Sequence, residues 1–591
     1  MKKFIYVVMT LLLLMSGCSS NEAPVVESAM EKKGDVTIIY TNDIHSNINN
    51  QKKNEDDTIT TLLTYSKVAA VKKAYEAEGK NVILADAGDH VQGTAYGSFD
   101  EGESMMKLME ATGYDVATIG NHEFDYGMFR FFEIMDKSTV PYVCCNFISL
   151  EDNQNVLPAY EIIEKDGVKV AVIGIITPSA IDSSTPTYFQ NEKGEYLYDF
   201  LADGTGEAIY AKVQETIDEA RTKANYVVVL AHTGIANEDI PYTCYDIIHN
   251  TTGIDAYIDG HTHSQIEYEE VEDKEGNLVV YTQTGCYLNA IGVMEIHDGE
   301  IKTHLITEYE EMDEEVHKVE EEVINSVNEV LGEQIGVLET EMYIYNPEDD
   351  KDRIVRRSET NLSDLIADSV YYEFNEALEL PCDVTFINGG GVRASIPQGD
   401  ITYLDVKSAQ PFGNVICLIE VTGQQLLDAL EANCTTLGTI TQEGKLAEPG
   451  LLHTSGLIYT IDTSIEFTGK LDENGTYIEA PTSDYRVKDI KIYNKETMQY
   501  EAIDLTKTYR VGGINYLLRN GGGGLLEIFK DCKLVIDYVD EDYLTLSKYI
   551  QAFEEVDGMP HVVTKNSPLM KYENFLLDYE NPYGAGRIMI K

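Results

Sequence analysis

Residues 120–127 read Gly-Asn-His-Glu-Phe-Asp-Tyr-Gly and follow directly on the hydrophobic run 116–119. This short loop carries three polar groups of different chemistry, namely Asn121, His122 and Asp125. A carboxamide oxygen can bind a metal ion, an imidazole can move a proton, and a carboxylate three residues on can hold that imidazole in place. The plainer alternative is a glycine-rich turn with a structural histidine, so the interpretation depends on whether other strands end in the same way.

The same arrangement recurs along the N-terminal half of the chain. Hydrophobic runs alternate there with amphipathic stretches, which is typical of an α/β layered domain. Five buried runs are followed by Asp, His or Asn: 36–40 by Asp43 and His45, 81–84 by Asp89, 116–119 by Asn121 and His122, 226–230 by His232, and 256–258 by His261 and His263. Because the carboxyl ends of strands form the functional edge of an α/β sheet, we expect these side chains to converge.

The chemistry of this set predicts a metal centre. Carboxylate, imidazole and carboxamide groups suit hard and borderline divalent cations. The set is too large for one tetrahedral zinc ion and contains no thiol, so a site for two divalent metal ions with one bridging carboxylate fits better. The ligand types suit Zn²⁺, Mn²⁺ or Fe, of which we expect zinc or manganese.

Composition limits the partners of the protein. A chain of 591 residues with 43% hydrophobic and 25% charged residues is globular and long enough for two or more domains. The formal net charge of −58 argues against nucleic acid or an anionic membrane surface as the main partner. An anionic substrate therefore needs a locally cationic site, built from metal ions or arginines.

The N-terminus is a targeting segment. A basic start, an apolar run over 4–15 and Cys18 resemble a bacterial lipoprotein signal. This resemblance implies a signal peptide over 1–17, lipidation of Cys18 and a flexible tether over 18–33. The alternative is an ordinary signal peptide cut near Ser19. We expect the protein either at the extracellular face of the cell membrane, with the lipid anchor as its only membrane contact, or secreted.

Of the nine cysteines, Cys18 belongs to this signal. An even number of remaining cysteines in an exported protein permits disulfides, but their spacing does not assign any pair. Cys417, inside a hydrophobic run, is typical of a buried thiol.

The composition changes after residue 306. Residues 308–322 are strongly acidic, and valines recur at helical spacing at Val316, Val319, Val323, Val327 and Val330. This pattern predicts an amphipathic helix within 309–340 whose charges form a solvated face. The predicted helix separates a first domain over 34–308 from a second over 341–591.

The second domain has its own motifs. Two arginines, Arg356 and Arg357, precede a predicted helix, and the strand 384–387 ends in Asn388-Gly-Gly-Gly-Val-Arg393. Further on come Gln410-Pro-Phe412, Asn515-Tyr516 and the glycines 521–524. Clustered glycines are expected at special turns or where another group approaches closely, and each cluster taken alone could be only a tight turn.

Together these motifs resemble the 5′-nucleotidase family over essentially the whole mature chain. Asp43-x-His45, Gly88-Asp89, Gly120-Asn-His-Glu123, His232 and Gly260-His-Thr-His263 stand in the order of the calcineurin-like metallophosphoesterase signature. The later motifs are similar to the C-terminal domain of that family. The resemblance implies an α/β fold with an N-terminal four-layer αββα domain, a linker helix and a C-terminal α/β substrate-binding domain.

The resemblance also implies a role for each residue. One metal ion would be held by Asp43, His45 and His263, the other by Asn121, His232 and His261, with Asp89 bridging. The catalytic residues would be His122 and Asp125. The substrate and its phosphate would be bound by Arg356, Asn388 and Arg393, and the base would contact Phe412 and, as a stand-in, Tyr516. The implied activity is an extracellular, metal-dependent phosphohydrolase that releases phosphate from nucleoside 5′-phosphates. No nucleic acid or protein partner is inferred.

Two positions depart from the family pattern, and both concern the nucleoside. Leu517 stands where the family usually has a second stacking aromatic, and Gly523 stands where it usually has an Asp that binds ribose hydroxyls. The preferred substrate therefore stays open among those of a 5′-nucleotidase, a 2′,3′-cyclic-nucleotide phosphodiesterase and a UDP-sugar hydrolase. A surface nucleotide-binding protein without turnover is the non-enzymatic alternative.

Overall fold

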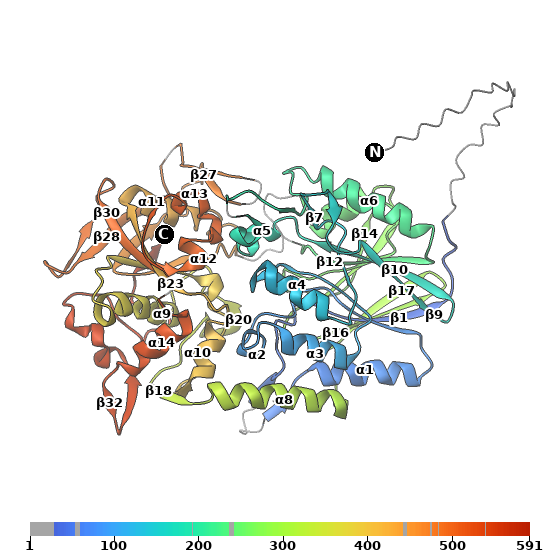
Figure 1. Ribbon diagram of the computed structural model, residues 1–591, viewed down its shortest axis with the longest axis horizontal. Helices are drawn as coiled ribbons and strands as arrows, with labels where there is room; N and C mark the ends of the chain where they lie inside the picture. Colours follow the sequence, from blue (N-terminus) through green and yellow to red (C-terminus); the bar gives the residue numbers. More distant parts are fainter. Residues whose placement is uncertain are drawn as a thin grey trace, which may run out of the picture.

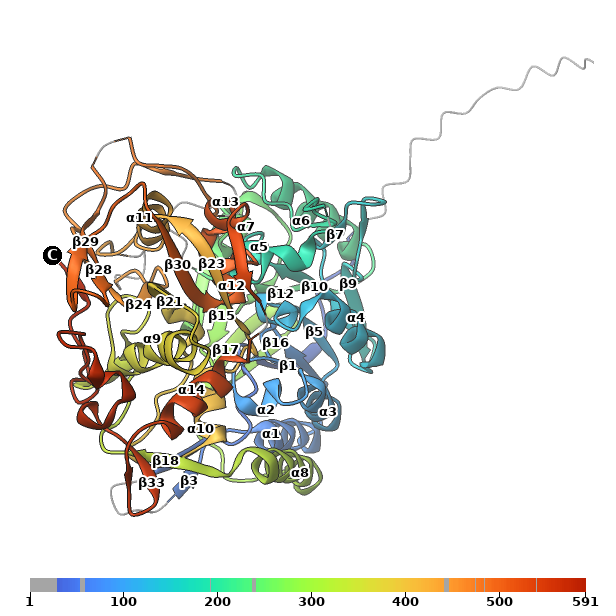
Figure 2. The same cartoon turned by 60° about the vertical axis from the view of Figure 1, so that its left-hand side comes forward.

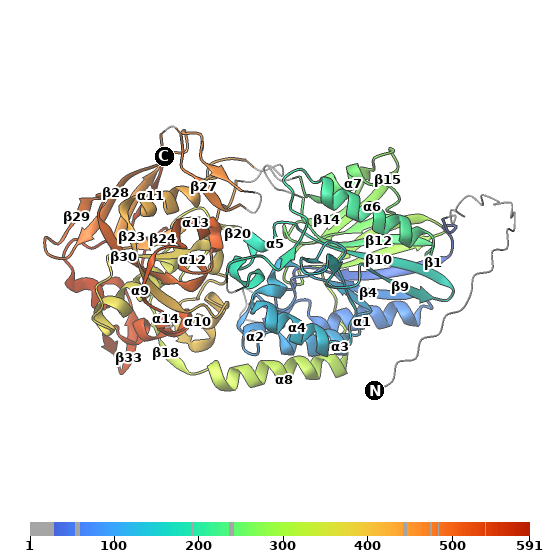
Figure 3. The same ribbon diagram turned by 45° about the horizontal axis from the view of Figure 1, so that its top comes forward.

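The computed structural model of the chain describes residues 29–53, 59–191, 193–235, 241–440, 446–472, 475–482, 484–537 and 539–591. An N-terminal half and a C-terminal half lie side by side and are joined along one side by a long helix, α8 (Glu314–Leu331) (Figures 1 and 3). The predicted signal peptide, Cys18 and most of the predicted tether lie outside the described residues.

Two six-stranded sheets form the centre of the N-terminal half. The first has the order β17 (Glu300–Ile306), β16 (Ile291–His297), β1 (Asp35–Thr41), β4 (Val82–Asp86), β5 (Val116–Thr118) and β6 (Tyr142–Val143). The second has the order β14 (Gln265–Glu272), β15 (Leu278–Thr284), β13 (Ala256–Ile258), β12 (Tyr226–His232), β10 (Val168–Ile176) and β9 (Tyr160–Lys165). The strands β1, β4, β5 and β6 run parallel, as do β10, β12, β13 and β15.

The two sheets pack face to face, and helices cover their outer faces. Every residue of β12 is buried, as expected for a central parallel strand with a continuous hydrophobic sequence. Ile38 of β1 and Val228 of β12 belong to one apolar cluster between the sheets. The helices α1 (Tyr65–Ala77) and α3 (Glu103–Thr112) pack on the first sheet, and α6 (Glu207–Arg221) and α7 (Cys244–Asn250) pack on the second. The predicted four-layer αββα arrangement is therefore confirmed.

The linker helix α8 packs along α1 and α3 rather than standing free between the halves (Figure 1). Its buried face contains Val316, Val323 and Val327, as the spacing predicts, but Val330 is 59% exposed and the next residue, Leu331, is buried in its place. Glu320 is an exception to the predicted solvated face of acidic residues. Its carboxylate is buried and accepts a 2.7 Å hydrogen bond from the Ser66 amide. The helix ends at Leu331, and β18 (Gln334–Leu338) then enters a sheet of the C-terminal half.

Three sheets organise the C-terminal half. A five-stranded sheet has the order β24 (Leu452–Ser455), β21 (Val384–Asn388), β30 (Thr508–Ile514), β23 (Ile416–Thr422) and β31 (Lys533–Ile536). A four-stranded sheet contains β29 (Gln499–Ala502), β28 (Val487–Asn494), β25 (Leu457–Ile461) and β34 (Ile588–Ile590). Another contains β22 (Gly399–Thr402), β18, β33 (Met559–Val562) and β32 (Glu555–Val556).

Helices of this half pack in series against the five-stranded sheet. The helix α9 (Asn361–Tyr372) contacts β21, β24 and β30, α14 (Asp542–Gln551) packs on α9, and α10 (Tyr403–Ala409) packs on α14 (Figure 2). The helix α11 (Gly423–Ala432) follows β23 and packs against it. The C-terminal half is thus a mixed α/β domain, as predicted.

The cysteines after residue 29 are free thiols, and most of them, including Cys417, are buried. Within the described part of the chain, no helix combines the length and the apolar character needed to cross a membrane.

Candidate active site

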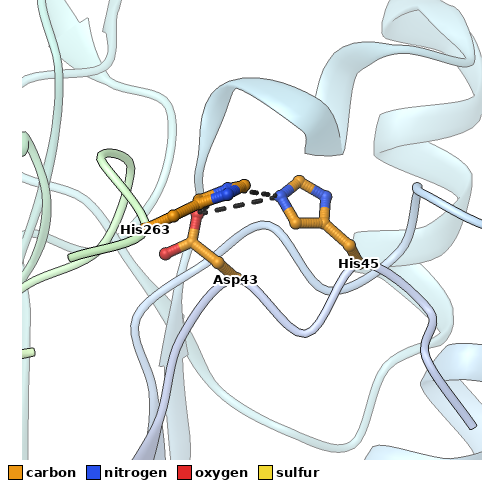
Figure 4. Close-up of side chains that lie close together, drawn as sticks. All are labelled: Asp43, His45 and His263. Atoms are coloured by element: carbon orange, nitrogen blue, oxygen red, sulfur yellow. Dashed lines mark hydrogen bonds and ion pairs between the residues drawn. The ribbon is translucent and has the colours of Figure 1, made fainter. Parts of the chain in front are cut away.

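The seven predicted metal ligands come together at the carboxyl ends of five strands, β1, β4, β5, β12 and β13. Asp43, His45 and His263 offer ligand atoms that all lie within 4.8 Å of one another, and their side chains point toward a common centre (Figure 4). A second group with the same property consists of Asp43, Asp89 and His232. The two groups share Asp43, so they form one continuous cluster.

The remaining two predicted ligands complete this cluster. His261 Nδ1 and Asn121 Oδ1 are 3.0 Å apart, and the His261 ring lies 5.2 Å from the ring of His232. Asn121 belongs to a short 3₁₀ turn, η1 (Asn121–Phe124), which the glycine-led loop forms after β5. The structure therefore brings all seven side chains to one place.

Most of these ligands sit on strained backbone. Positive φ angles occur at Asp43 (48°), His45 (50°), Asp89 (59°), His261 (80°) and His263 (57°). Residues other than glycine adopt this left-handed region at an energetic cost, and such residues concentrate at functional sites. The strain is thus independent support for a functional cluster, because the sequence pattern contains no information about φ.

Two glycines permit the close approach of the ligand loops. A Cβ added to Gly120 would lie 2.2 Å from Asp89 Oδ1 and 2.8 Å from His232 Nε2. A Cβ added to Gly260 would lie 2.8 Å from both Asp43 Oδ2 and His232 Nδ1. Any side chain at these two positions would push the ligands apart.

The histidines are oriented as ligands of a cation. His232 Nδ1 donates to the Ala87 carbonyl at 2.8 Å, and His45 Nδ1 donates to the Gln92 carbonyl at 2.9 Å. These hydrogen bonds fix the tautomer and direct each Nε2 into the cluster. His232 Nε2 is buried and, within the described structure, makes no hydrogen bond of normal geometry, although Asp89 Oδ2 lies 3.0 Å away. A buried nitrogen of this kind fits a metal ion.

The electrostatics of the cluster also call for positive charge. Burial disfavours an imidazolium, but the carboxylates of Asp89 and Asp43 outweigh it and raise the pKa of His232 to about 10. Two buried carboxylates that approach the same imidazole need cations beside them. The donor set of this chain fits divalent metal ions in that role.

His122 and Asp125 form a pair at the edge of the cluster. His122 Nδ1 lies 2.5 Å from Asp125 Oδ2, and the backbone N–H of His122 donates to Asp89 Oδ1 at 2.9 Å. Burial opposes the charged imidazole, yet the neighbouring carboxylates of Asp125 and Asp89 raise the pKa of His122. Because Asp125 occupies Nδ1, the other ring nitrogen is the one available to a ligand.

A cavity of about 760 Å³ lies between the two halves and joins their predicted site residues. His122, Asp125 and several ligands line it from the N-terminal half; Arg356, Asn388, Arg393, Phe412 and Tyr516 line it from the C-terminal half. The Phe412 ring lies 5.9 Å from the His122 ring, and the Arg393 guanidinium lies 5.7 Å from Phe412. All predicted substrate-binding residues thus share one cavity with the predicted catalytic pair.

The structure distinguishes between the neighbouring arginines. Arg357 is paired with Asp352 at 2.5 Å and with Glu448 at 3.4 Å, which makes it structural. Arg356 uses only Nε, which donates to the Glu448 carbonyl at 3.3 Å; within the described residues its terminal nitrogens have no hydrogen-bond acceptor. Asn388 Oδ1 is likewise buried without a partner there. Arg356 and Asn388 therefore keep polar atoms available to a ligand.

The two departures from the family pattern have different structural outcomes. Leu517, in α12 (Asn515–Leu518), is fully buried in the apolar core, so it cannot stack on a base. Its neighbour Tyr516 lines the cavity. Gly523, in η5 (Gly522–Gly524), lines the cavity as bare backbone.

Sequence reasoning left Glu123 without a role, although it stands inside the loop at 120–127. Its buried carboxylate accepts the backbone N–H groups of Asp89 and His90 at 2.9 Å and that of Gly120 at 2.5 Å. It therefore ties the Asp89 loop to the Asn121 loop. The His90 ring is held by Asp86 at 2.9 Å and Tyr142 at 2.6 Å, and its Nδ1 also lies 3.5 Å from Glu123 Oε1.

Three other lining residues carried no motif that would have identified them. Ser184 follows α5 (Ala180–Ser183), and its hydroxyl donates to the Asn121 carbonyl at 2.6 Å. Asn433 follows α11, and Glu448 lies in the loop before β24. These residues reach the cavity only through tertiary packing.

Comparison with known proteins agrees with this architecture. A family model for calcineurin-like phosphoesterases matches residues 36–265, and one for the 5′-nucleotidase C-terminal domain matches residues 334–531. The trifunctional nucleotide phosphoesterase protein YfkN of Bacillus subtilis is 26% identical over 86% of this chain, which spans about a third (33%) of that protein's length. A 5′-nucleotidase of Vibrio parahaemolyticus is 25% identical over 71% of this chain and 78% of its own.

A solved structure shows the same fold. The 5′-nucleotidase precursor of Thermus thermophilus superposes with a TM-score of 0.72 at 23% identity, over 94% of this chain and 99% of its own. The calcineurin-like phosphoesterase family implies divalent metal ions, which the ligand set described above fits. The chain belongs to the 5′-nucleotidase family, with a calcineurin-like phosphoesterase domain followed by a 5′-nucleotidase C-terminal domain.

Proposed function

We propose that this protein is a metal-dependent phosphohydrolase that releases phosphate from nucleoside 5′-monophosphates. The observation that supports the proposal most is the shared cavity, in which the metal-ligand cluster and His122 face Arg356, Arg393 and Phe412. One end of the cavity is suited to a phosphoryl group, and the other offers a flat aromatic surface. A nucleotide presents the same two features, a phosphate and a planar base.

The ligand cluster would hold two divalent cations. One would be bound by Asp43, His45 and His263, the other by Asn121, His232 and His261, and Asp89 would bridge them. When bound, such cations supply charge neutralisation at a phosphoryl group and lower the pKa of an attacking water.

The arginines would position the phosphate. Since Arg356 Nε is engaged by the Glu448 carbonyl, its terminal nitrogens can donate to two phosphate oxygens in a fixed orientation. Arg393 lies over Phe412 and would approach the same phosphate from the side of the base. These cationic groups answer the need for local positive charge in a chain of net charge −58.

His122 would act on the leaving oxygen. Asp125 accepts the Nδ1 proton, which fixes the ring and leaves the other nitrogen to donate a proton to the departing ester oxygen. The Phe412 ring lies 5.9 Å from the His122 ring, so a base stacked on Phe412 would be held beside the catalytic pair. His122 also lies near ligand atoms of His45 and Asp89, so a measurement of metal content must distinguish a catalytic role from a ligand role.

We further propose that the protein is exported and anchored through a lipid on Cys18. The support is the sequence of the first eighteen residues, which resembles a lipoprotein signal. Labelling cells with a radioactive fatty acid, with Cys18→Ala as the control, tests the anchor. We expect label in the wild type and none in the variant, and an unlabelled wild type would refute the anchor.

A substrate panel tests the proposed reaction. The mature protein is stripped of metal with a chelator, reloaded with Mn²⁺ or Zn²⁺, and assayed on AMP, ADP, UDP-glucose, 2′,3′-cyclic AMP and an aryl phosphate. We expect activity only after reloading and the highest kcat/KM with AMP. A preference for UDP-glucose or the cyclic nucleotide would assign the chain to another activity of its family, and equal rates with AMP and the aryl phosphate would refute nucleotide recognition.

A further inference from the structure

The nucleoside end of the cavity contains an asparagine that no motif marks. Asn433 follows α11, is only 3% exposed and lines the cavity together with Gly523 and Tyr516. A buried polar side chain at a cavity wall normally has its hydrogen bonds satisfied by the protein or by a ligand. Any atom of Asn433 that the protein leaves unused is therefore a candidate contact for a substrate.

The amide nitrogen of Asn433 is occupied by backbone. Its Nδ2 donates to the Ala429 carbonyl at 3.2 Å and to the Gly523 carbonyl at 3.3 Å. The nitrogen carries two hydrogens, so both are used. The side chain is therefore held from two elements, α11 and η5, and its oxygen remains as a fixed acceptor.

That oxygen borders the space that a side chain at position 523 would enter. Gly523 has a φ of +65°, and a Cβ added there would lie 3.1 Å from Asn433 Oδ1 and 3.5 Å from the buried Leu517 Cδ2. A side chain at 523 would therefore press on the carboxamide of Asn433 in its present rotamer. In this chain the glycine leaves the space to the carboxamide oxygen.

A fixed acceptor restricts which part of a nucleotide can bind beside it. A phosphate offers only acceptors near neutral pH and would be repelled by the carboxamide oxygen. The planar base is already matched by the ring of Phe412. The ribose hydroxyls remain, and each can donate a hydrogen bond to such an oxygen.

We propose that Asn433 Oδ1 binds a ribose hydroxyl of the substrate and thereby makes Asn433 a specificity-determining residue. This inference rests on the proposed hydrolysis of nucleotides. The acceptor is neutral, so its hydrogen bond is weaker than one to a carboxylate. Loss of one neutral hydrogen bond corresponds to a change of about tenfold in kcat/KM.

The test compares a ribonucleotide with an analogue that lacks the hydroxyls. The ratio of kcat/KM for AMP to that for 2′,3′-dideoxy-AMP is measured for the metal-loaded wild type, for Asn433→Ala and for Asn433→Asp, with an aryl phosphate as a substrate without ribose. We expect a ratio of about ten in the wild type and a ratio near one in Asn433→Ala. In Asn433→Asp the acceptor is kept but its carboxylate cannot donate to the Ala429 and Gly523 carbonyls, so the ratio should fall below that of the wild type. Turnover of the aryl phosphate should change less than about twofold.

Asn375→Ala is the matched control. Asn375 also donates from Nδ2 to a carbonyl four residues earlier, Tyr371 at 3.0 Å, but it does not line the cavity. Its variant should keep the wild-type ratio. The same ratio in Asn433→Ala as in the wild type would overturn the proposal, as would a parallel loss of aryl phosphate turnover, which would make Asn433 merely structural.

Two further outcomes distinguish a failure of ribose recognition by Asn433 from a failure of the proposed nucleotide hydrolysis. If Asn433→Ala loses discrimination between AMP and IMP instead of between ribose and dideoxyribose, the oxygen reads the base and the proposal is wrong. If the wild type hydrolyses the aryl phosphate but not AMP, nucleotide hydrolysis itself fails, and ribose recognition fails with it.

Discussion

Glu123→Gln is the most informative single change, because Glu123 connects the two loops that carry Asp89 and Asn121. Its Oε2 accepts the N–H groups of Asp89 (2.9 Å) and Gly120 (2.5 Å), and its Oε1 accepts that of His90 (2.9 Å). Glutamine keeps the shape but replaces one oxygen with an NH₂ group that cannot accept these bonds. The substitution therefore removes one or two hydrogen bonds and weakens the rest by removing the charge.

The expected loss of stability follows from these bonds. A hydrogen bond to a charged acceptor contributes about 1.5–3 kcal/mol, a neutral one about 0.5–1.5 kcal/mol, and a buried N–H without a partner costs about 1–3 kcal/mol. If the NH₂ group takes the place of Oε2, two bonds are lost and one is weakened, and the free energy of unfolding should fall by about 4–7 kcal/mol. The Asp89 loop has a φ of 59° at Asp89, so it should also relax away from the ligand cluster.

Relaxation of the Asp89 loop should lower metal affinity, and this change tests whether Glu123 positions the predicted ligands. Partners that orient metal ligands typically change metal affinity by about 10–100-fold when they are replaced, and we expect a loss in this range. Glu431→Gln is the matched control, because Glu431 is fully buried and accepts the N–H groups of Arg486 and Val487 at 2.9 Å, but it lies in the C-terminal half.

Metal affinity is measured by titration of the metal-free proteins, and stability by urea unfolding of the same samples. Both variants should lose stability, whereas only Glu123→Gln should lose metal affinity and activity. Equal metal affinity in the two variants would refute the view that Glu123 positions the ligands.

Three further predictions concern the catalytic pair, the arginines and the pH dependence of stability. His122→Asn should lower kcat by about 10²–10⁴-fold with metal content unchanged, and loss of metal would make His122 a ligand instead. Arg356→Ala should raise KM for AMP by more than about tenfold at little cost in stability. Arg357→Ala, which breaks the pair with Asp352, should lower stability and leave KM for AMP nearly unchanged. Burial lowers the pKa of His453 to about 4, and its ring donates only to a backbone carbonyl, so the neutral form is the one that folds. This contribution, about 3 kcal/mol, is complete above a pH of about 6.5 and is lost as the pH falls toward about 4; urea midpoints of His453→Gln should therefore depend less on pH than those of the wild type.

The sequence was sufficient for the fold because strands and ligands repeat one simple pattern. The runs at 36–40 and 226–230 became β1 and β12, and each has a predicted ligand at its carboxyl end. The linker helix was less well predicted. The valine spacing placed Val330 on the buried face, whereas continuation of the helical period selects Leu331. The burial of Glu320 was invisible in the sequence, because it depends on the Ser66 amide, 254 residues away along the chain.

In the site as well, contacts between residues close in sequence could be predicted, whereas contacts that depend on tertiary packing could not. His122 and Asp125 are three residues apart, so their contact follows from local geometry. The roles of Glu123 and Asn433 depend on backbone groups that other elements present to them, at Asp89 and at Gly523 respectively. No pattern of residue types in one short stretch indicates such contacts.

The two ends of the cavity are built in different ways, and this difference bears on how selectivity and chemistry are related. At the phosphate end, strained backbone at Asp43 and Asp89 and the bare backbone of Gly120 fix the ligands, so a substitution there disturbs every group at once. At the nucleoside end, one side-chain oxygen on Asn433 and one absent side chain at Gly523 share a single space. The two positions are therefore coupled, because a Cβ at 523 would lie 3.1 Å from the Asn433 oxygen and the carboxamide would have to shift. If the proposed roles hold, changes at 433 and 523 should alter selectivity for the sugar and leave the rate on an aryl phosphate nearly constant.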